Sequence, residues 1–234
     1  MMFGGCPPGG GQIGKEYTQN KWMKKMLEHA TTIRLISFGL IFILVALWEI
    51  RMPRRPLKTS KKRRWIANLS IITINPVLLR LVFPLLAVEA AQSAQVNGWN
   101  LLNRIEFPSI AAFGIGIVLL DLVVYLQHVM FHSVPLLWRL HMMHHADLDY
   151  DLTTGLRFHP IEIVMSMALK LTVIVVLGLP VVSVLVFEII LNGMAMFNHA
   201  NIKIPQPVDA WLRRVVVTPD MHRVHHSVII RETN

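Results

Sequence analysis

Cysteine is nearly absent from this sequence, since Cys6 is the single one among 234 residues. A lone cysteine excludes an internal disulfide and a zinc cluster built from several thiolates. Charged residues are also scarce, at 16% of the chain, whereas a soluble domain usually carries about 25%. Together with 53% hydrophobic residues, this deficit indicates that a lipid bilayer is the solvent of much of the chain.

Acidic residues are few, with 14 Asp and Glu against 23 Lys and Arg, and the net charge is +9. Much of the excess comes from residues 51–64, which carry Arg and Lys but no acid and lie between two apolar stretches. This arrangement is typical of a cytoplasmic loop that obeys the positive-inside rule. No basic helix or row of stacking aromatics accompanies it, so we do not expect a nucleic-acid partner.

The first residues lack the charged start and early apolar core of a signal peptide, and residues 1–14 are rich in Gly and Pro. We therefore expect residues 1–30 to form a disordered or amphipathic lead. The remainder, residues 31–234, is predicted to be one membrane-embedded domain.

Long apolar stretches follow at residues 32–50, 65–91, 109–127 and 163–197. A helix needs about 20 apolar residues to span a bilayer, so each of the first three fits one crossing. The fourth is too long and is interrupted at Leu177-Gly178-Leu179-Pro180, which predicts a hairpin of two helices. The second contains Pro76 and Arg80, which predict a kink and a snorkelling or buried cation. The fold class is therefore an all-α, integral membrane helical bundle with four to five transmembrane helices.

The basic loop also fixes the orientation of these helices. If residues 51–64 are cytoplasmic, alternate crossings place residues 128–132, 141–159 and everything from His199 onward on the same cytoplasmic side. The histidines were not used to choose this topology. We expect a site on the cytoplasmic face of a bacterial inner membrane or an ER membrane.

Histidine is the residue that stands out, because ten of the 11 histidines lie between positions 128 and 226. Residues three or four apart on a helix share a face, so histidines at these spacings project together. Pro135 is expected to end the third membrane helix, Pro160 and Glu162 to begin another, and Thr218-Pro219 to begin a last one. The groups are His128-x3-His132, His141-x2-His144-His145, His159, His199 and His222-x2-His225-His226.

So many imidazoles exceed the needs of one ion, because a catalytic zinc uses three protein ligands and a structural zinc four. Two ions with four or five imidazoles each would use them, and the apolar setting favours redox chemistry over hydrolysis. A metal transporter or metal-storage membrane protein is a second hypothesis, although transport sites lie near the bilayer midplane. A b-type haem subunit is a third, but haem needs only one or two axial histidines.

The sequence resembles the fatty acid hydroxylase/sterol desaturase superfamily over about residues 65–232. The resemblance rests on YLQHVMFHSVPLLWRLHMMHHADLDYDLTTGLRFHPIE, FNHANIKIP and VVVTPDMHRVHHS. It implies a membrane di-iron site (di-zinc in some preparations) under a cytosolic helical cap that carries the histidines. It also implies O2-dependent hydroxylation or desaturation of a sterol, acyl chain or ether lipid. Electrons would come from a donor protein or a reduced cofactor. The implied metal ligands are His128, His132, His141, His144, His145, His159, His199, His222, His225 and His226.

Two departures from the family pattern accompany the resemblance. Some members carry a second histidine upstream of the position of His199, where this chain has Ala195, which leaves room for His159 or a water. Relatives continue beyond the position of Asn234 with a tail that closes the cap, so we expect that tail to be missing here.

The last prediction concerns acidic residues that lie near the histidines in the sequence and could support them. Metal-bound histidines usually donate their second ring N–H to a carboxylate or a carbonyl. We expect Asp121, Glu162 and Glu188 to accept such hydrogen bonds. The alternative is helix capping for Glu162 and pairing with a neighbouring arginine for the others.

Overall fold

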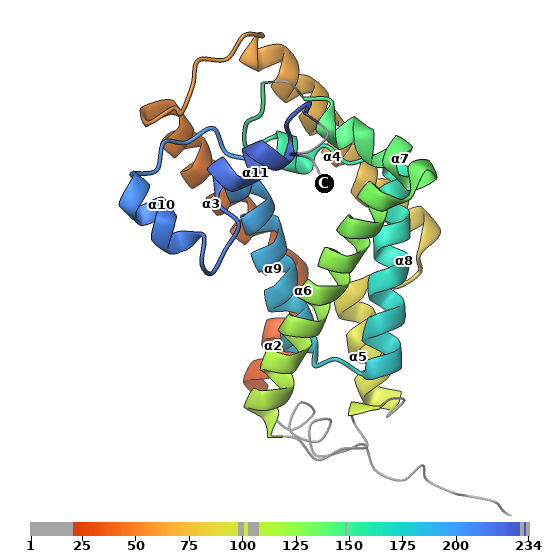
Figure 1. Ribbon diagram of the computed structural model, residues 1–234. Helices are drawn as coiled ribbons and strands as arrows, with labels where there is room; N and C mark the ends of the chain where they lie inside the picture. The colour runs from red at the N-terminus through yellow and green to blue at the C-terminus, as the bar shows by residue number, and fades with distance from the viewer. Residues whose placement is uncertain (1–20, 98–100, 103–107, 148, 230–231, 233–234) are drawn as a thin grey trace, which may run out of the picture.

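The computed structural model describes residues 21–97, 101–102, 108–147, 149–229 and 232 (Figure 1). Most of the predicted N-terminal lead therefore lies outside the described residues, and its described part begins with helix α2 (Lys21–Glu28). The described residues form helices and connecting segments, apart from one isolated β-bridge between Pro53 and Ile202. The all-α prediction is confirmed.

Five helical stretches are long and apolar enough to cross a membrane. This agrees with the four to five crossings that the sequence predicts. They are α3 (Ala30–Arg51), the pair α4 (Lys61–Val82) and α5 (Ala87–Asn97), α6 (Ser109–Ser133), α8 (Pro160–Leu177) and α9 (Val181–Asn198).

The second crossing contains a break that the sequence analysis did not predict. Helix α4 continues through Pro76 to Val82, and the helix is interrupted only at residues 83–86, which contain Pro84. Phe83 is extended, as expected for a residue that precedes proline. Arg80 and Glu89 lie on the two sides of the break and form a bidentate pair, with N···O distances of 2.9 and 2.7 Å.

The predicted hairpin between α8 and α9 is present. Gly178 has a φ of 71°, the left-handed conformation that ends many helices, and its N–H donates to the carbonyl of Ile174. Pro180 then precedes α9. Helix α6 packs closely against α9, because a Cβ atom on Gly116 would lie 2.8 Å from that of Ser183.

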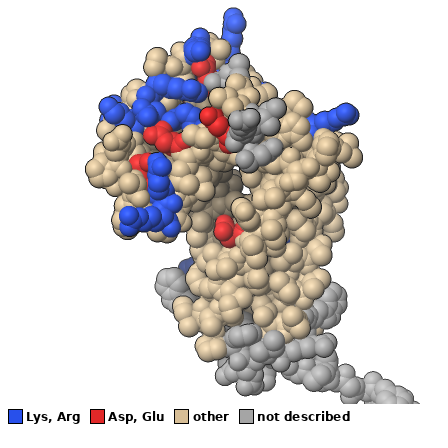
Figure 2. All heavy atoms as spheres, in the orientation of Figure 1, with Lys and Arg blue, Asp and Glu red and all other residues tan. Residues whose placement is uncertain are grey.

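The remaining elements form a cap at one end of the bundle, opposite the α8–α9 turn (Figure 1). The loop after α3 is joined to this cap: Arg54 N–H donates to Asn201 O at 3.0 Å, and Lys203 N–H donates to Met52 O at 2.9 Å. Lys and Arg gather at the same end in Figure 2. The cap consists of α7 (Pro135–His145), the 3₁₀ helix η2 (Thr154–Leu156), α10 (Gln206–Leu212), α11 (Pro219–His225) and their connecting segments.

Candidate metal centre

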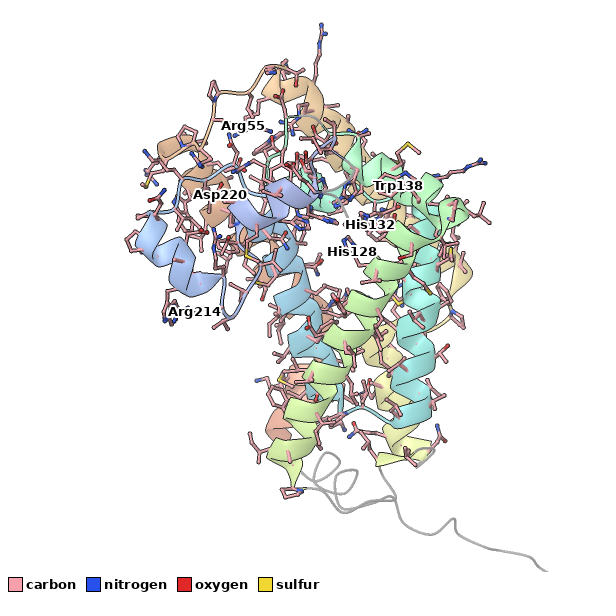
Figure 3. The ribbon with its side chains drawn as sticks, viewed as in Figure 1. Arg55, His128, His132, Trp138, Arg214 and Asp220 are labelled. Carbon is pink, nitrogen blue, oxygen red and sulfur yellow. The ribbon has the colours of Figure 1, made fainter. Side chains whose placement is uncertain are left out.

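Prolines set the ends of the helices that carry the histidines. Helix α6 runs to Ser133 and α7 begins at Pro135, so His128 and His132 occupy the last turns of α6, near the corner with α7 (Figure 3). Helix α11 begins at Pro219 after Thr218 in the extended N-cap conformation. These helix boundaries agree with the sequence analysis. They bring parts of the chain that are distant in sequence close together, and each part carries histidine side chains.

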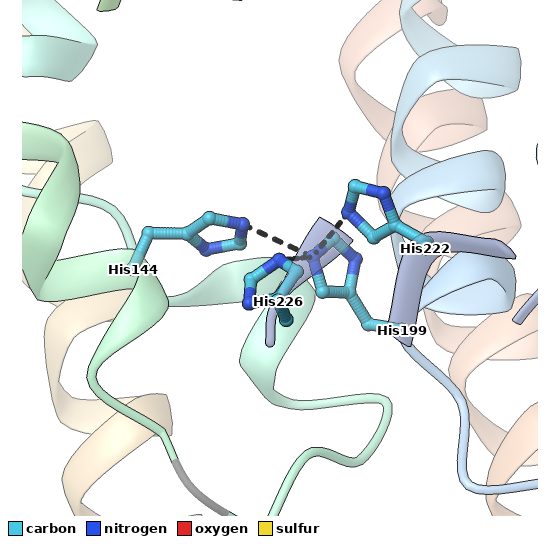
Figure 4. A group of neighbouring side chains, drawn as sticks. All are labelled: His144, His199, His222 and His226. Carbon is cyan, nitrogen blue, oxygen red and sulfur yellow. Dashed lines mark hydrogen bonds between the residues drawn. The ribbon is translucent and has the colours of Figure 1, made fainter. Parts of the chain in front are cut away.

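Four histidines form the first group, which we call the four-histidine set (Figure 4). The Nε2 atom of His199 lies at the focus of the set, 3.0 Å from Nε2 of His144 and 3.0 Å from Nε2 of His222. It lies 3.2 Å from Nε2 of His226. Ligand nitrogens about 2.0–2.1 Å from a tetrahedral ion are about 3.3 Å apart, so this spacing fits a shared cation.

Hydrogen bonding alone does not account for the four-histidine set. His199 Nδ1 lies 2.7 Å from the carbonyl oxygen of Ala195, which only accepts, so Nδ1 carries the ring proton. The Nε2 atom of neutral His199 is then a bare lone pair that faces three other ring nitrogens. One lone pair accepts one hydrogen atom well, whereas a cation placed among the four nitrogens would bind a lone pair of each ring.

Five further histidines form the five-histidine set, which consists of His128, His132, His141, His145 and His225. Groups of ring nitrogens within 4.8 Å of one another link all five residues. The His132 ring lies at the middle of the set, with centroids 4.5 to 4.9 Å from those of the other four. The Nε2 atoms of His141 and His145 are buried without a hydrogen-bond partner. The two sets adjoin, because the rings of His145 and His226 stack at 4.1 Å.

Burial favours the neutral form of His145 and His199. Desolvation, with the neighbouring imidazoles His141 and His225, lowers the pKa of His145 to about 2. Desolvation also lowers the pKa of His199 to about 3, although its hydrogen bond to the Ala195 carbonyl opposes the shift. A neutral imidazole offers the lone pair that a metal needs. The nine histidines together therefore form a nitrogen-rich cluster that can hold metal.

Of the remaining predicted site residues, Glu162 lies beside the histidines. Its Oε1 atom is 2.8 Å from Nδ1 of His141, and both side chains are buried. A carboxylate there fixes the ring with Nε2 turned toward the cluster. His159 is placed differently and lies outside the two histidine sets. Its Nδ1 accepts the N–H of Ile161 at 3.2 Å, so His159 caps the start of α8.

Asp121 and Glu188 are not brought to the histidines, and the expectation that they support metal-bound rings is not met. Glu188 is buried between two cations, Arg34 at 3.2 Å and Lys170 at 3.7 Å, which is the alternative of pairing with a neighbouring cation. Asp121 is exposed and lies two helical turns before His128, about 10 Å along the axis of α6. An aspartate side chain is too short to reach from there.

A buried ion-pair network that the sequence analysis missed supports the segment after α7. Arg64 donates to Asp147 at 2.9 and 2.7 Å and to Asp151 at 2.7 Å. Asn68 donates to Asp147 and to Thr153. The network anchors the chain three residues beyond His144. The acidic run Asp147–Asp151 was a usable signal, because several buried carboxylates require a nearby cation.

Glu49, at the end of α3, is a second missed residue. Its Oε1 atom accepts the backbone N–H of Leu152 and of Asn201, each at 2.7 Å. Leu152 lies in the segment that follows the histidines of α7, and Asn201 lies in the segment that follows His199. One carboxylate thus fixes the spacing of two histidine-bearing segments, and no spacing rule in the sequence shows this.

Comparison with known proteins agrees with the geometry. A family model described as fatty acid hydroxylase matches residues 113–234, which is more than half of the chain and contains all nine clustered histidines. The chain belongs to the fatty acid hydroxylase family. The superfamily resemblance inferred from the histidine motifs is therefore confirmed.

This fatty acid hydroxylase family member is also similar to the ornithine lipid hydroxylase OlsE of Rhizobium tropici. The two are 26% identical over 217 residues, which is 86% of this chain and 63% of the relative. The chain thus spans less than two thirds of that relative's length. No solved structure matches the chain. Family membership supports an enzyme that acts on lipid. The five apolar helices indicate that this enzyme is a multi-pass membrane protein.

Proposed function

We propose that this protein is an O2-dependent, non-haem di-iron monooxygenase that hydroxylates a C–H bond of a membrane lipid. The observation that carries the proposal is the nine-histidine cluster at the end of an apolar helical bundle. Imidazole nitrogens suit iron, and also zinc and copper. Membership of a hydroxylase family favours iron, because zinc has no redox chemistry.

Two bound irons would supply O2 activation and electron exchange. The balanced reaction is RH + O2 + 2e⁻ + 2H⁺ → ROH + H2O, with the electrons from a donor protein or a reduced cofactor. We propose hydroxylation over desaturation because the matched family and the similar relative are both hydroxylases. The four-histidine set would hold one ion and the five-histidine set the other.

The protein's own residues would hold and orient these ions. Glu162 would accept the outer N–H of His141, and the Ala195 carbonyl would accept that of His199, so both rings keep Nε2 for the metal. The Arg64 network and Glu49 would hold the segments that carry the ligands. Burial of the rings would exclude bulk water from the reaction.

We further propose that the cluster lies on the cytoplasmic side of the membrane. The support is the basic loop 51–64, which lies at the same end of the bundle as the histidines. A lipid would then reach the cluster laterally from the cytoplasmic leaflet. An ornithine lipid is the first substrate to test, because the similar relative is named for hydroxylating one.

The test is metal analysis of the purified protein followed by single-turnover oxidation of ornithine lipid under 18O2. The proposal expects two irons per chain, no haem absorption band, and one 18O atom in the product. Substituting His199→Ala should abolish the product while the protein still inserts in the membrane. Iron-loaded, reduced protein that consumes no lipid across sterols, acyl lipids, ether lipids and ornithine lipids would contradict the proposal.

A further inference from the structure

Four of the five acidic residues in the described spanning helices have recorded partners. Glu188 lies between Arg34 and Lys170, and Glu49 accepts two backbone N–H groups. Glu89 pairs with Arg80, and Glu162 pairs with His141.

Asp121 differs from these four. Its side chain is exposed at the middle of α6, and no hydrogen bond or ion pair is recorded for it within the described structure. An unpaired carboxylate in a spanning segment costs several kcal/mol, and such residues usually mark a functional site. A carboxylate at this depth therefore calls for a cation that the described residues do not supply.

The position of Asp121 on α6 connects it with the histidine cluster. Residues 121, 125, 128 and 132 are spaced by four, three and four, so Asp121, Tyr125, His128 and His132 share one edge of the helix. That edge reaches the cluster, because His128 Nε2 lies 2.9 Å from Nε2 of His225. Tyr125 is 60% exposed between the carboxylate and the histidines. A polar edge thus leads from the middle of an apolar helix to the metal-binding rings.

The chemistry of this edge selects a class of ligand. A carboxylate attracts an ammonium group, and a tyrosine ring one helical turn away offers its face to the same cation. A purely hydrocarbon substrate could pack against the tyrosine ring but would leave the carboxylate without a partner. A lipid that carries an amine would offset the cost of a carboxylate in the spanning segment and would be held about 10 Å along the helix from His128.

We propose that Asp121 and Tyr125 form a binding site for the ammonium group of an aminolipid substrate. The proposal rests on the proposed lipid hydroxylation and names the substrate class for it. Asp121 supplies the charge, Tyr125 supplies the aromatic face, and together they orient the lipid toward the cluster.

The test compares ornithine lipid with the same lipid acetylated on its free amine. Wild-type protein should bind and hydroxylate the free-amine lipid with a KM at least about tenfold lower than that of the acetylated lipid, which corresponds to about 1.4 kcal/mol. Asp121→Asn should raise the KM for the free-amine lipid to that of the acetylated lipid and leave kcat largely unchanged. Asp121→Glu should restore much of the preference, and Tyr125→Phe should keep it because the ring remains.

Glu89→Gln is the matched control. It also replaces an acid by an amide in a membrane-spanning segment, but it leaves the α6 edge intact. It should retain the amine preference. Iron content and unfolding temperature of each variant report whether it has folded. Asp121→Asn protein that keeps the preference, or that loses kcat equally for both lipids as a proton-transfer or structural role requires, would overturn the proposal.

A binding measurement separates this inference from the proposed function. Purified protein should gain more thermal stability from the free-amine lipid than from the acetylated lipid, and Asp121→Asn should remove the difference. If wild-type protein binds selectively but hydroxylates neither lipid, the hydroxylase proposal fails and the amine site stands. If it hydroxylates both lipids without selectivity, the amine site fails and the hydroxylase proposal stands.

Discussion

The two histidine sets are assembled in different ways. Four of the five rings in the five-histidine set come from α6 and α7, where helical spacing alone turns His128 toward His132 and His141 toward His145. The four-histidine set draws on α7, on the segment after α9 and on α11, which meet only through contacts across the cap. The first set is thus mostly local in sequence, whereas the second depends on the tertiary structure.

The sets also differ in redundancy. Loss of one ring leaves four imidazoles in the five-histidine set and three in the four-histidine set. We therefore expect the ion held by the four-histidine set to be more sensitive to substitution in the ligands and in the surrounding cap.

The largest effect is expected from substituting the ring at the focus of the four-histidine set. His199→Ala should reduce the iron content from two to about one per chain and lower activity by more than 100-fold, beyond the roughly 10–100-fold typical of lost supporting partners. His132→Ala should retain more iron, because four imidazoles remain in its set. Iron analysis of both purified variants makes the comparison, and equal loss in the two would remove the proposed asymmetry.

Removing Arg64, the half-buried cation of the ion-pair network, should have the next largest effect. Arg64→Ala leaves Asp147 and Asp151 buried without their partner, and breaking such a pair costs about 3–5 kcal/mol. The four-histidine set should lose its ion first because its segments depend on this network. Thermal unfolding and iron content are the measurements. Lys62→Ala, at an exposed position in the same helix, is the control that should leave both unchanged.

A smaller effect is expected at the carboxylate beside His141. Glu162→Gln keeps the shape but removes the charge that orients the ring, so metal affinity of the five-histidine set should fall by about 10–100-fold. His159→Ala removes only a helix cap, at about 1 kcal/mol, and should leave metal affinity unchanged. Chelator competition assays on both variants test the contrast. A greater loss of metal from the His159 variant would reverse the assignment of the two residues.

Acidification should distinguish the two sets least, because each set contains a histidine whose pKa is lowered. In the folded, metal-free protein the pKa of His145 is about 2 and that of His199 about 3, against an ordinary value of 6.5. The unfolded chain therefore binds more protons below pH 6.5. The free energy of unfolding of the metal-free protein should be highest above pH 6.5 and should fall steadily as the pH drops toward 3. Urea unfolding of chelated protein between pH 7.5 and pH 4.5 measures this, and a flat profile would contradict the burial of neutral rings.

The local features of the fold were predictable because each depends on a short stretch of sequence. The end of α6 before Pro135, the start of α11 at Pro219 and the left-handed turn at Gly178 all follow from the conformational limits of proline and glycine. The break at residues 83–86 was not predicted. Pro76, which predicted a kink, lies inside α4, because a proline inside a spanning helix removes one hydrogen bond and can be accommodated.

The supporting residues were less predictable because they depend on long-range contacts. Arg64 and Asp147 are far apart in sequence, so neither residue's role is visible locally. Helical spacing placed Asp121 correctly on the face of His128, but the rise of the helix separates the two by about 10 Å. Glu188 was assigned to the histidines from its place in the membrane, whereas Arg34 and Lys170, on other helices, are its partners.

X-ray absorption spectroscopy at the iron edge of the purified protein tests the central claim most directly. The account predicts two irons per chain, each surrounded mainly by nitrogen at imidazole distances. His199→Ala should lower the iron content to about one per chain, and the iron that remains should keep its nitrogen surroundings. Iron bound chiefly through oxygen, or a His199→Ala variant that keeps two irons per chain, would contradict it.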